Sequence, residues 1–272
     1  MKIDSTLHNH CMLCDGASTL QEMAAAAYAA GFSDLGISCH TWAPFDPGFG
    51  VRDEPAYRAA VAFLRESWRG RLRISCGMEQ DFYAPAAQRD KLDYVIGSLH
   101  YLADVAQGRY FAVDSSAAQL AQAIEELFDG NGLAAAEAYY RELTRLARQQ
   151  QPDIIGHFDL VVKHNRGNRF FDEESAAYRD AALTALEAVA ATGAVFELNT
   201  RAVYRGHRAA PYPADFLLRR LRELGAPVML SADCHLAAEL TAGLTEAAAR
   251  LRGLGFREVA VWHDGGFTSQ RL

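Results

Sequence analysis

The sequence predicts an α/β fold in which parallel strands, each followed by a helix, close into a barrel. First, short apolar runs alternate with helical stretches rich in Ala, Leu and Glu along the whole chain. Second, His, Asp and Glu side chains recur where the predicted strands end. A parallel barrel collects its catalytic groups from the carboxyl ends of several strands, whereas an open sheet concentrates its site at one switch point. Candidate ligands after nearly every strand therefore favour closure.

The predicted strands are short apolar runs, and several, such as Val95-Ile96-Gly97, are continuous, as is typical of strands buried on both faces. In chain order they are residues 3–8, 34–38, 72–77, 93–99, 153–157, 194–199, 227–232 and 257–262. Their number suggests seven or eight strand–helix units, which is compatible with a closed barrel.

The predicted helices lie between these strands. They are residues 19–30, 54–68, 117–128, 133–150, 174–192, 213–224 and 243–254. Thr19 followed by Glu22 predicts a capping box at the start of the first helix. Gly31, Gly193 and Gly225 each follow a helix, where glycine supplies a left-handed C-cap.

The chain has 272 residues, of which 50% are hydrophobic, and it shows no repeat, low-complexity linker or shift in composition. We therefore expect one domain over residues 1–272. Two long segments without a clear pattern, 41–53 and 101–116, interrupt the alternation. Long loops of this kind often cover a functional site, so we expect them to act as lids.

Charge and hydropathy exclude several classes of function. The net charge of −7 argues against broad nucleic-acid binding through a basic surface. No apolar run reaches the length of a membrane span, and the polar start Met-Lys-Ile-Asp does not resemble a signal peptide. We therefore expect a cytoplasmic protein that does not bind membranes. The odd count of five cysteines argues against a disulfide framework. Cys11-x-x-Cys14 has zinc or redox spacing, but no second pair accompanies it, which favours an ordinary role.

His8 and His10 point to metal chemistry. Side chains two apart on a strand project to the same face, so both imidazoles can reach one ion. A lone His-x-His pair is a weak signal, but further metal-competent residues occur in the same setting. They are His40, His100, His157 and His235, with Asp15, Glu79 and Asp233 as acidic partners. Glu79 is expected after the third strand, and Asp233 and His235 after the seventh.

The motif series resembles that of the PHP (polymerase and histidinol phosphatase) superfamily. The matching segments are His8-Asn9-His10, Asp15-Gly16, Ser38-Cys39-His40, Gly77-Met78-Glu79, Ile96-Gly97-Ser98-Leu99-His100, Ile155-Gly156-His157-Phe158-Asp159-Leu160, Glu197-Leu198-Asn199-Thr200 and Asp233-Cys234-His235. Within the superfamily, the chain is most similar to histidinol-phosphate phosphatases. The resemblance extends from residue 3 to about residue 265 and keeps motif order and spacing.

The resemblance implies a distorted seven-stranded (βα) barrel of the TIM type that holds three divalent ions at the carboxyl ends of its strands. The first ion would be held by His8, His10, Glu79 and Asp233. Glu79 would bridge to a second ion completed by His100 and His157, and Asp15, His40 and His235 would hold the third. Imidazole and carboxylate ligands suit Zn, Fe or Mn, and a carboxylate can bridge two ions. Cys39 is a departure, because relatives usually carry Asp beside this histidine.

Three divalent ions would make the site positive despite the acidic chain, which favours a phosphate substrate. A water that bridges two metals would ionise near neutral pH and attack phosphorus in line. Asp233 or His235 is then a candidate to protonate the leaving alkoxide. Lys163 and Arg201 are candidate phosphate ligands, and a solvated surface charge is the alternative for each. Arg205, His164 and His207 lie in the same loops, whereas His263 is expected to be structural.

Aromatic side chains near the predicted lids could form a pocket wall for an imidazole ring, or could be ordinary packing residues. They are Trp42, Phe45, Phe49, Phe82, Tyr83 and Tyr101. Nearby carboxylates, Asp46, Asp53 or Asp81, could recognise a cationic substrate.

The function implied by the resemblance is hydrolysis of L-histidinol phosphate, a small phosphorylated metabolite of histidine biosynthesis. One alternative is a PHP phosphoesterase that acts on a nucleotide, a cyclic phosphate or an oligonucleotide end. Another alternative is a metal-binding protein without activity, which the complete set of candidate ligands disfavours.

Overall fold

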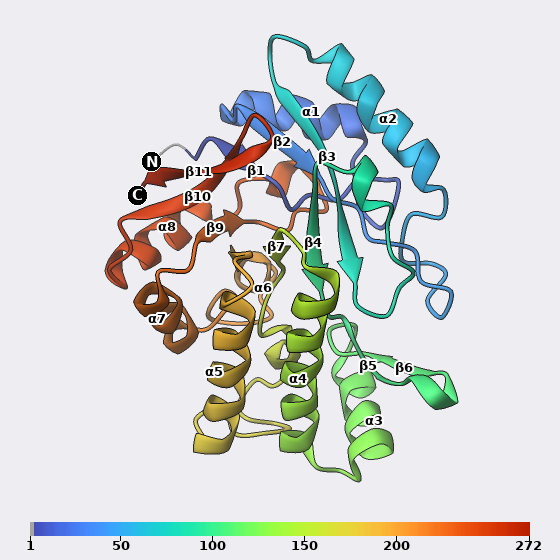
Figure 1. Cartoon of the computed structure of the whole chain (residues 1–272), viewed down its shortest axis with the longest axis vertical. Helices are drawn as coiled ribbons and strands as arrows, with labels where there is room; N and C mark the ends of the chain where they lie inside the picture. Colours follow the sequence, from blue (N-terminus) through green and yellow to red (C-terminus); the bar gives the residue numbers. More distant parts are fainter. Residues whose placement is uncertain (1–2) are drawn as a thin grey trace.

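The computed structural model describes residues 3–272, and its main feature is a seven-stranded parallel sheet (Figure 1). Its strands are β1 (Ser5–Thr6), β2 (Asp34–Ile37), β3 (Arg73–Asp81), β4 (Tyr94–Ser98), β7 (Ile154–Ile155), β8 (Val195–Asn199) and β9 (Val228–Ser231). They follow one another in the order β1-β2-β3-β4-β7-β8-β9. Each predicted strand up to residue 232 thus supplies one strand of this sheet, although β1 and β7 are much shorter than expected.

The two edges of the sheet approach each other, so the barrel is nearly closed. A parallel bridge joins Asn9, just past β1, to Cys234, just past β9. The His10 amide donates to the Cys234 carbonyl at 2.8 Å, and the Cys234 amide donates to the His8 carbonyl at 3.2 Å. The predicted barrel of parallel strands is therefore confirmed. Closure brings the carboxyl ends of the first and last strands side by side, where the motif residues lie.

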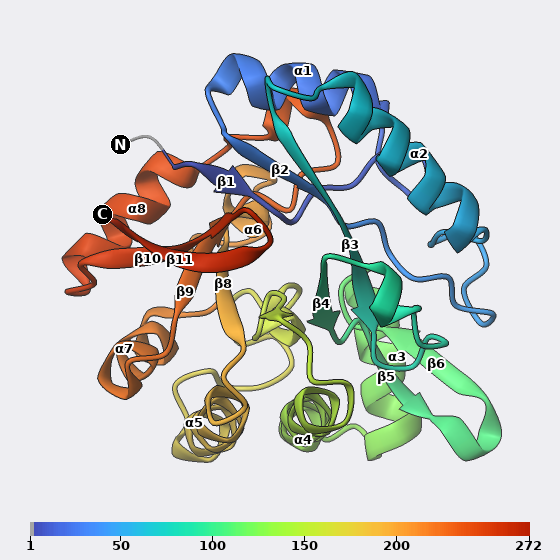
Figure 2. The ribbon, with the colours of Figure 1, turned by 45° about the horizontal axis from the view of Figure 1, so that its top comes forward.

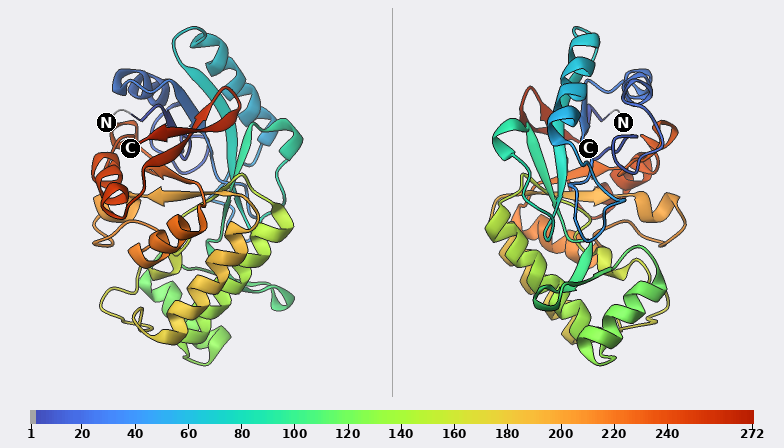
Figure 3. Two further views of the ribbon diagram at one scale, coloured as in Figure 1. Left: turned by 60° about the vertical axis from the view of Figure 1, so that its left-hand side comes forward. Right: turned by 90° about the vertical axis from the view of Figure 1, so that its right-hand side faces the viewer.

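Helices surround the sheet on its outer side (Figure 2). They are α1 (Leu20–Ala30), α2 (Glu54–Ser67), α3 (Ala117–Phe128), α4 (Gly132–Gln150), α5 (Ala176–Ala190), α6 (Arg201–Tyr204), α7 (Asp215–Leu224) and α8 (Leu244–Gly253). All seven predicted helices are present, and the short α6 is additional. The predicted capping box is also confirmed: Thr19 Oγ1 accepts from the Glu22 amide at 3.2 Å, and Glu22 Oε2 accepts from the Thr19 amide at 2.8 Å. The long helices α4 and α5 pack side by side (Figure 3).

Two segments differ from the sequence-based expectation. Residues 101–116 contain an antiparallel hairpin, β5 (Tyr101–Asp104) and β6 (Arg109–Ala112), which projects from the molecule (Figure 1). The eighth predicted strand forms β10 (Glu258–His263), which pairs with β11 (Gly266–Arg271) in a separate antiparallel hairpin. The apolar pattern identified β10 correctly as a strand. Only the fold shows that its partner is β11 and not a barrel strand.

The hairpin β10–β11 packs against the amino ends of the barrel strands. The Trp262 amide donates to Ser5 Oγ at 2.8 Å, and its indole N–H donates to Ser75 Oγ at 2.9 Å. Its ring also contacts Tyr94, the first residue of β4. Trp262 thus closes the end of the barrel that is opposite to the motif residues.

Apolar side chains from opposite strands fill the barrel next to Trp262. They are Leu7, Tyr94, Ile96, Ile154, Val195 and Met229. The Tyr94 ring requires glycine on the neighbouring strands, because an added Cβ would lie 2.2 Å from the Tyr94 hydroxyl at Gly36 and 2.3 Å from the ring at Gly77. The filled interior leaves the carboxyl ends of the strands for polar groups. Within residues 3–272, no helix has the length and apolarity that a bilayer span requires.

Candidate metal centre

Glu79 lies at the middle of the candidate ligands, and its Oε2 faces three histidines. This oxygen is 3.1 Å from His8 Nε2, 3.3 Å from His10 Nε2 and 2.9 Å from His40 Nδ1. Glu79 is fully buried. It was expected just after the third strand, but β3 is longer than predicted and includes it, paired with Ile96 of β4. The longer strand carries this carboxylate to the centre of the site.

The other oxygen of Glu79 faces two more histidines. Oε1 is 3.3 Å from His100 Nε2 and 3.0 Å from His157 Nε2, and these two nitrogens are 3.3 Å apart. The Ser98 hydroxyl donates to the same oxygen at 2.6 Å. His100 and His157 follow β4 and β7, so neighbouring strands deliver them to one point. One carboxylate therefore has a separate histidine group at each oxygen, which is the arrangement of a bridging ligand.

Asp233 lies beside His8 and His10. Its Oδ1 is 3.6 Å from His8 Nε2 and 3.5 Å from His10 Nε2. Asn199 donates to the other oxygen at 3.1 Å. The backbone of Asp233 has φ 49°, in the left-handed region that non-glycine residues seldom adopt. Such strain persists where surrounding contacts hold it, and it is common at functional sites.

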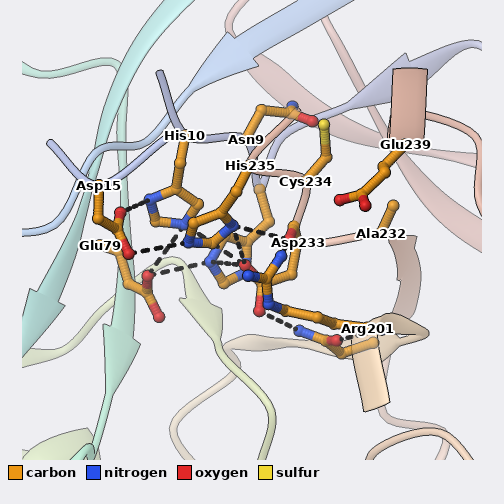
Figure 4. Close-up of polar contacts among 12 residues, drawn as sticks. Asn9, His10, Asp15, Glu79, Arg201, Ala232, Asp233, Cys234, His235 and Glu239 are labelled. Atoms are coloured by element: carbon orange, nitrogen blue, oxygen red, sulfur yellow. Dashed lines mark hydrogen bonds and ion pairs between the residues drawn. The ribbon is translucent and has the colours of Figure 1, made fainter. Parts of the chain in front are cut away.

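Asp15 connects the two histidines nearest the solvent. Its carboxylate is 3.6 Å from His40 Nε2, 3.2 Å from His235 Nε2 and 3.8 Å from His10 Nδ1. Figure 4 shows Asp15, His10, His235 and Asp233 converging, with Glu79 close by. In contrast to Glu79, Asp15 is partly exposed, with a side-chain accessibility of 32%. This part of the cluster therefore opens to the outside.

The buried ligand atoms fit a bound cation. His8 Nε2, His10 Nε2, His40 Nδ1 and Glu79 Oε2 are buried without a hydrogen-bond partner among the described residues. These atoms face one another at 2.9–3.3 Å without forming hydrogen bonds, and a divalent ion between them would satisfy several at once. The groups whose atoms lie close enough for one ion are His8, His10 and Asp233; His10, Asp15, His40 and His235; and His40, Glu79 and His100. Within residues 3–272 these groups contain every candidate ligand except His157, which is 3.0 Å from Glu79.

The carboxylates at the centre of the cluster are ionised. Burial alone would raise the pKa of Glu79, but the nearby His8, His40 and His100 hold it well below its usual range. The pKa of Asp233 is likewise low, because His8, His10 and Arg201 outweigh its burial. Both side chains are therefore carboxylates at neutral pH. Ionised oxygens beside imidazole nitrogens form the donor set that Zn, Mn or Fe binds in proteins.

A second layer of contacts orients the histidines. His8 Nδ1 donates to Glu197 Oε2 at 2.8 Å, which leaves Nε2 to face Glu79. His100 Nδ1 lies 3.3 Å from Asp81 Oδ2, so its Nε2 also points into the cluster. Carboxylates in this position fix the tautomer of a metal-binding histidine. Both contacts direct the free nitrogens to one point.

The cluster forms the floor of a cavity of about 330 Å³. Asp15, His40, His100, His157, Asp233 and His235 line its floor. Its wall includes Asp46, Phe49, Tyr101, Asp114, Lys163, Arg201, His207 and Tyr212. The segment 41–53, the hairpin β5–β6 and the loops after β7 and β8 supply this wall, so the predicted lids do adjoin the site. A small, mainly polar ligand fits such a cavity.

The sequence matches the family model described as PHP domain over residues 6–201. A protein of Deinococcus radiodurans named "Probable histidinol-phosphatase" is 32% identical over 269 residues, which are 94% of this chain and 95% of that protein. The chain belongs to the PHP domain family. The histidinol-phosphatase of Bacillus subtilis is 24% identical, and the match spans 86% of this chain and 94% of that enzyme.

Solved structures support the same fold for this PHP domain. The hisK structure from Listeria monocytogenes aligns with a TM-score of 0.75 at 19% identity and covers 89% of this chain and 99% of that one. Histidinol phosphate phosphatase (HISK) from Lactococcus lactis, crystallised with Zn, L-histidinol and phosphate, aligns with a TM-score of 0.69 at 18% identity and covers 98% of each chain.

The predicted basic residues of the PHP domain occupy different positions. Arg201 lines the cavity, and its Nη1 donates to the Asp233 carbonyl at 2.8 Å (Figure 4). Lys163 also lines the cavity, paired with Asp114. His207 is part of the wall, but Arg205 does not line the cavity and pairs with Glu239 at 2.9 Å.

The two remaining histidines have structural contacts. His164 Nε2 donates to the Asp114 carbonyl at 2.9 Å, next to the cavity wall. His263 lies beside Arg73 and Asp34, away from the metal cluster.

Only some of the aromatic and acidic candidates line the cavity. Phe49 stacks on His40 with 4.0 Å between ring centroids and lines the cavity together with Tyr101. The other candidate aromatics do not line it; Phe45, for example, stacks on Tyr110 of the hairpin. Asp46 lines the cavity, where its Oδ2 accepts from the Tyr101 hydroxyl at 2.8 Å.

Asp53 and Asp81 have other roles. Asp53 caps α2, because its side chain accepts from the Ala56 amide at 2.9 Å. Asp81 is buried behind His100 and accepts from its amide at 2.9 Å. Neither carboxylate is among the residues that line the cavity.

The cysteines lie near the metal cluster without joining it. Cys39 is fully buried, and its sulfur is 3.4 Å from that of Cys11. Cys14 Sγ lies 3.6 Å from His10 Nδ1. Within the described part of the chain, the candidate metal groups contain His, Asp and Glu but no Cys. The ordinary interpretation of Cys11-x-x-Cys14 fits this arrangement.

Two residues of the site, Glu197 and Asp114, were not singled out from the sequence. Glu197 stood in a quoted motif without a role, although a charged residue in the apolar run of β8 is a signal that it faces a polar centre. Asp114 lies after β6 in a segment without a pattern, and no local signal distinguishes it. Its position in the cavity depends on the fold of the β5–β6 hairpin.

Proposed function

We propose that this PHP domain is a metal-dependent phosphomonoesterase that hydrolyses L-histidinol phosphate to L-histidinol and phosphate. The observation that carries the proposal is the convergence of five histidines on Glu79, with His235, Asp15 and Asp233 beside them, at the floor of a small cavity. The similarity to the Deinococcus radiodurans protein named a histidinol-phosphatase covers nearly the whole chain and supports this substrate.

The proposed ligands form three neighbouring sites. His8, His10, Glu79 and Asp233 hold one ion; Glu79, His100 and His157 hold the second; Asp15, His40 and His235 hold the third. The contacts within each group span 3.0–3.6 Å, which is compatible with this division. His40 also lies 2.9 Å from Glu79, so the three sites adjoin one another. Bound divalent ions would supply Lewis-acid stabilisation of phosphate oxygens and would lower the pKa of water.

The side chains of the chain itself bind and orient the ester. The Arg201 side chain donates to the carbonyl of Asp233, which fixes its guanidinium at the cavity, where its other N–H groups can donate to a phosphate oxygen. Lys163 offers a second positive charge on the same wall. Together they counter the charge that develops as the ester bond breaks.

Asp233 and His235 are the candidates to transfer the proton that the leaving alkoxide needs. The Asp233 carboxylate lines the cavity beside His235, where it is a candidate to pass a proton from the attacking water to the leaving alkoxide. His235 Nδ1 lies 3.1 Å from the Asp233 carbonyl and 3.5 Å from its carboxylate, close enough to share this role. Burial, together with the neighbouring His10, lowers the pKa of His235, so its imidazole is neutral at neutral pH, as a metal ligand must be.

The cavity favours a small ester with a cationic group. Its volume of about 330 Å³ is at the lower end of ligand sites, which suits an imidazole and an amine better than a nucleotide. Asp46, Asp114 and the aromatic rings of Phe49 and Tyr101 provide carboxylates and π faces for such groups.

The test compares substrates. We expect kcat/KM for L-histidinol phosphate to exceed that for AMP and for p-nitrophenyl phosphate by at least tenfold in the same metal. Arg201→Ala should raise KM for each ester, whereas Arg205→Ala, whose side chain does not line the cavity, serves as the matched control. A tenfold preference for the nucleotide would refute the substrate while leaving the metal chemistry intact.

We also propose that the chain is one folding unit. One apolar cluster runs from Cys11 to Val261, and the C-terminal hairpin packs against the first strand through Trp262 and Ser5. A single cooperative unfolding transition in circular dichroism and fluorescence is expected. Two separate transitions would indicate two domains.

A further inference from the structure

Asp114 and Lys163 form an ion pair in the wall of the cavity. Lys163 Nζ is 3.2 Å from Asp114 Oδ2, and the side chains retain accessibilities of 17% and 27%. Both residues line the cavity together with His100 and His157. The Asp114 backbone is held in place, because its carbonyl accepts from His164 Nε2 at 2.9 Å. A pair of opposite charges thus faces the space that the proposed substrate occupies.

Each member of the pair depends on the other. Within residues 3–272, Lys163 is the one hydrogen-bond partner of the Asp114 carboxylate, and Asp114 is the one partner of the Lys163 ammonium. Asp46, the other carboxylate of the wall, has no cationic partner of this kind; it accepts a hydrogen bond from the neutral Tyr101 hydroxyl at 2.8 Å. Removing one partner from a partly buried ion pair leaves an uncompensated charge, which is unfavourable.

A phosphate monoester competes for Lys163. Its dianion carries more charge than a single carboxylate and binds a lysine ammonium strongly. If Lys163 turns to the phosphate, Asp114 loses its partner. An ammonium group on the same ester can replace it. In a 2-aminoalkyl phosphate, nitrogen and phosphorus are separated by two carbons and one oxygen, a span on the order of 4–5 Å given bonds near 1.5 Å.

We infer that Asp114 and Lys163 act as an exchangeable ion pair that selects phosphate esters of 2-amino alcohols. Lys163 moves to the phosphate, and Asp114 accepts the ammonium of the substrate, so that two new ion pairs replace one. An ester without the amine leaves Asp114 unpaired and is therefore disfavoured. Asp114 is thus a specificity-determining residue. This inference rests on the proposed phosphatase function and adds the chemical basis of its selectivity.

The first test compares two esters that differ only in the amine: L-histidinol phosphate and 3-(imidazol-4-yl)propyl phosphate. We expect the wild-type protein to prefer the aminated ester by at least tenfold in kcat/KM. In Asp114→Asn the ratio should fall to near one, because the aminated ester loses a partner while the other ester meets a Lys163 without a competing carboxylate. Asp104→Asn, on the same hairpin and outside the cavity, is the control.

The second test measures binding of the products by calorimetry, without turnover. In the metal-loaded wild-type protein, inorganic phosphate should tighten the binding of L-histidinol about tenfold, because it withdraws Lys163 from Asp114. In Asp114→Asn this coupling should disappear. Folding of each variant is checked by its melting temperature, and the wild-type coupling is informative even if a variant does not fold.

Failure of this inference is distinguishable from failure of the proposed function. An Asp114→Asn protein that keeps the wild-type preference for the aminated ester, or wild-type binding of L-histidinol that is independent of phosphate, would overturn the exchange. A wild-type protein that prefers AMP would refute the substrate assignment. The change that Asp114→Asn produces in the ratio of the two matched esters decides the exchange in either case.

Discussion

At the scale of single residues, Glu79 contacts more of the candidate metal ligands than any other described residue of the site. Its two oxygens approach five histidines, and it is ionised and fully buried. A carboxylate with this many imidazole neighbours couples the proposed metal sites, because any ion bound by one group shares Glu79 with the next. The negative charge of Glu79 should therefore affect metal binding more than the size of its side chain does.

Glu79→Gln tests this coupling. The amide keeps the size of the side chain but loses the charge and one acceptor oxygen. We expect metal content to fall clearly and kcat/KM to fall roughly 100-fold or more, since even residues behind the ligands change affinity 10–100-fold. Mass spectrometry of bound metal and steady-state kinetics measure both. Glu246→Gln, on the exposed face of α8, is the control. Full metal content in Glu79→Gln would contradict the bridging role.

Glu197 acts through His8. Its Oε2 accepts from His8 Nδ1 at 2.8 Å, and its Oε1 accepts from the amide of His157. In Glu197→Gln, an NH2 group replaces one of the two acceptor oxygens. Because this group cannot accept a hydrogen bond, the bond to either His8 or the His157 amide is lost. We expect metal affinity to fall about 10–100-fold with the overall fold retained. Competition with a chelating dye measures the affinity. An unchanged affinity would show that His8 is oriented without Glu197.

At the scale of elements, Tyr57 connects a helix to two strands behind the site. From α2, its hydroxyl lies 2.9 Å from the Ile37 carbonyl of β2 and 2.7 Å from the Gly77 carbonyl of β3. Tyr57→Phe should lower the free energy of unfolding by about 1–2 kcal/mol, because the two buried carbonyls lose the single hydroxyl proton that they share. Urea unfolding measures the loss. Tyr28→Phe, with an exposed ring on α1, should have no effect.

The first helix provides a test of pH dependence. Hydrogen bonds from the Thr19 amide and hydroxyl lower the pKa of Glu22 below its ordinary value of 4.5. Because the folded pKa is the lower one, this contribution to stability is present above pH 4.5 and is lost as the pH falls through the folded value. Thr19→Ala should return the pKa of Glu22 towards 4.5 and lower Tm by about 2 °C. The return should be partial, because the amide of residue 19, the larger cause of the shift, remains in Thr19→Ala. NMR titration of the Glu22 carboxyl measures the shift, and an unchanged pKa would show that the Thr19 hydroxyl does not contribute to it.

At the scale of the whole molecule, the polar cluster and the apolar interior occupy opposite ends of the barrel. Leu7 and Trp262 belong to the apolar end, whereas His8 and His10, only one and three residues past Leu7, belong to the polar end. Buried ligand atoms without partners make the metal-free state costly for the protein. Metal binding should therefore stabilise the entire fold.

Metal removal tests this expectation. An ion present at about 1,000 times its Kd stabilises a protein by about 4 kcal/mol. For a chain of this size, treatment with a chelator should lower Tm by about 5–10 °C. Differential scanning calorimetry measures the change, and adding zinc or manganese back should restore it. Equal Tm values before and after chelation would show that the cluster binds no metal strongly.

The sequence by itself determined the barrel and most of the cluster of candidate metal ligands. Apolar runs of five to seven residues predict the strands, and in a parallel barrel every strand delivers its carboxyl end to the same face. Ligands at those ends therefore meet without further information, as His100 and His157 do. The capping box of Thr19 and Glu22 is equally local, because both partners lie within one turn.

Only the tertiary structure decided the roles that depend on distant partners. Nothing near Glu197 in the sequence indicates its bond to His8, and nothing near Asp114 indicates that the β5–β6 hairpin carries it to Lys163. Asp46, Asp53 and Asp81 were equivalent candidates until the fold directed only Asp46 to the cavity. The hydrophobic periodicity of the sequence indicates which face of a helix or strand is buried. It does not indicate which residues of other elements contact that face, because the closure of the barrel and the geometry of the loops determine those contacts.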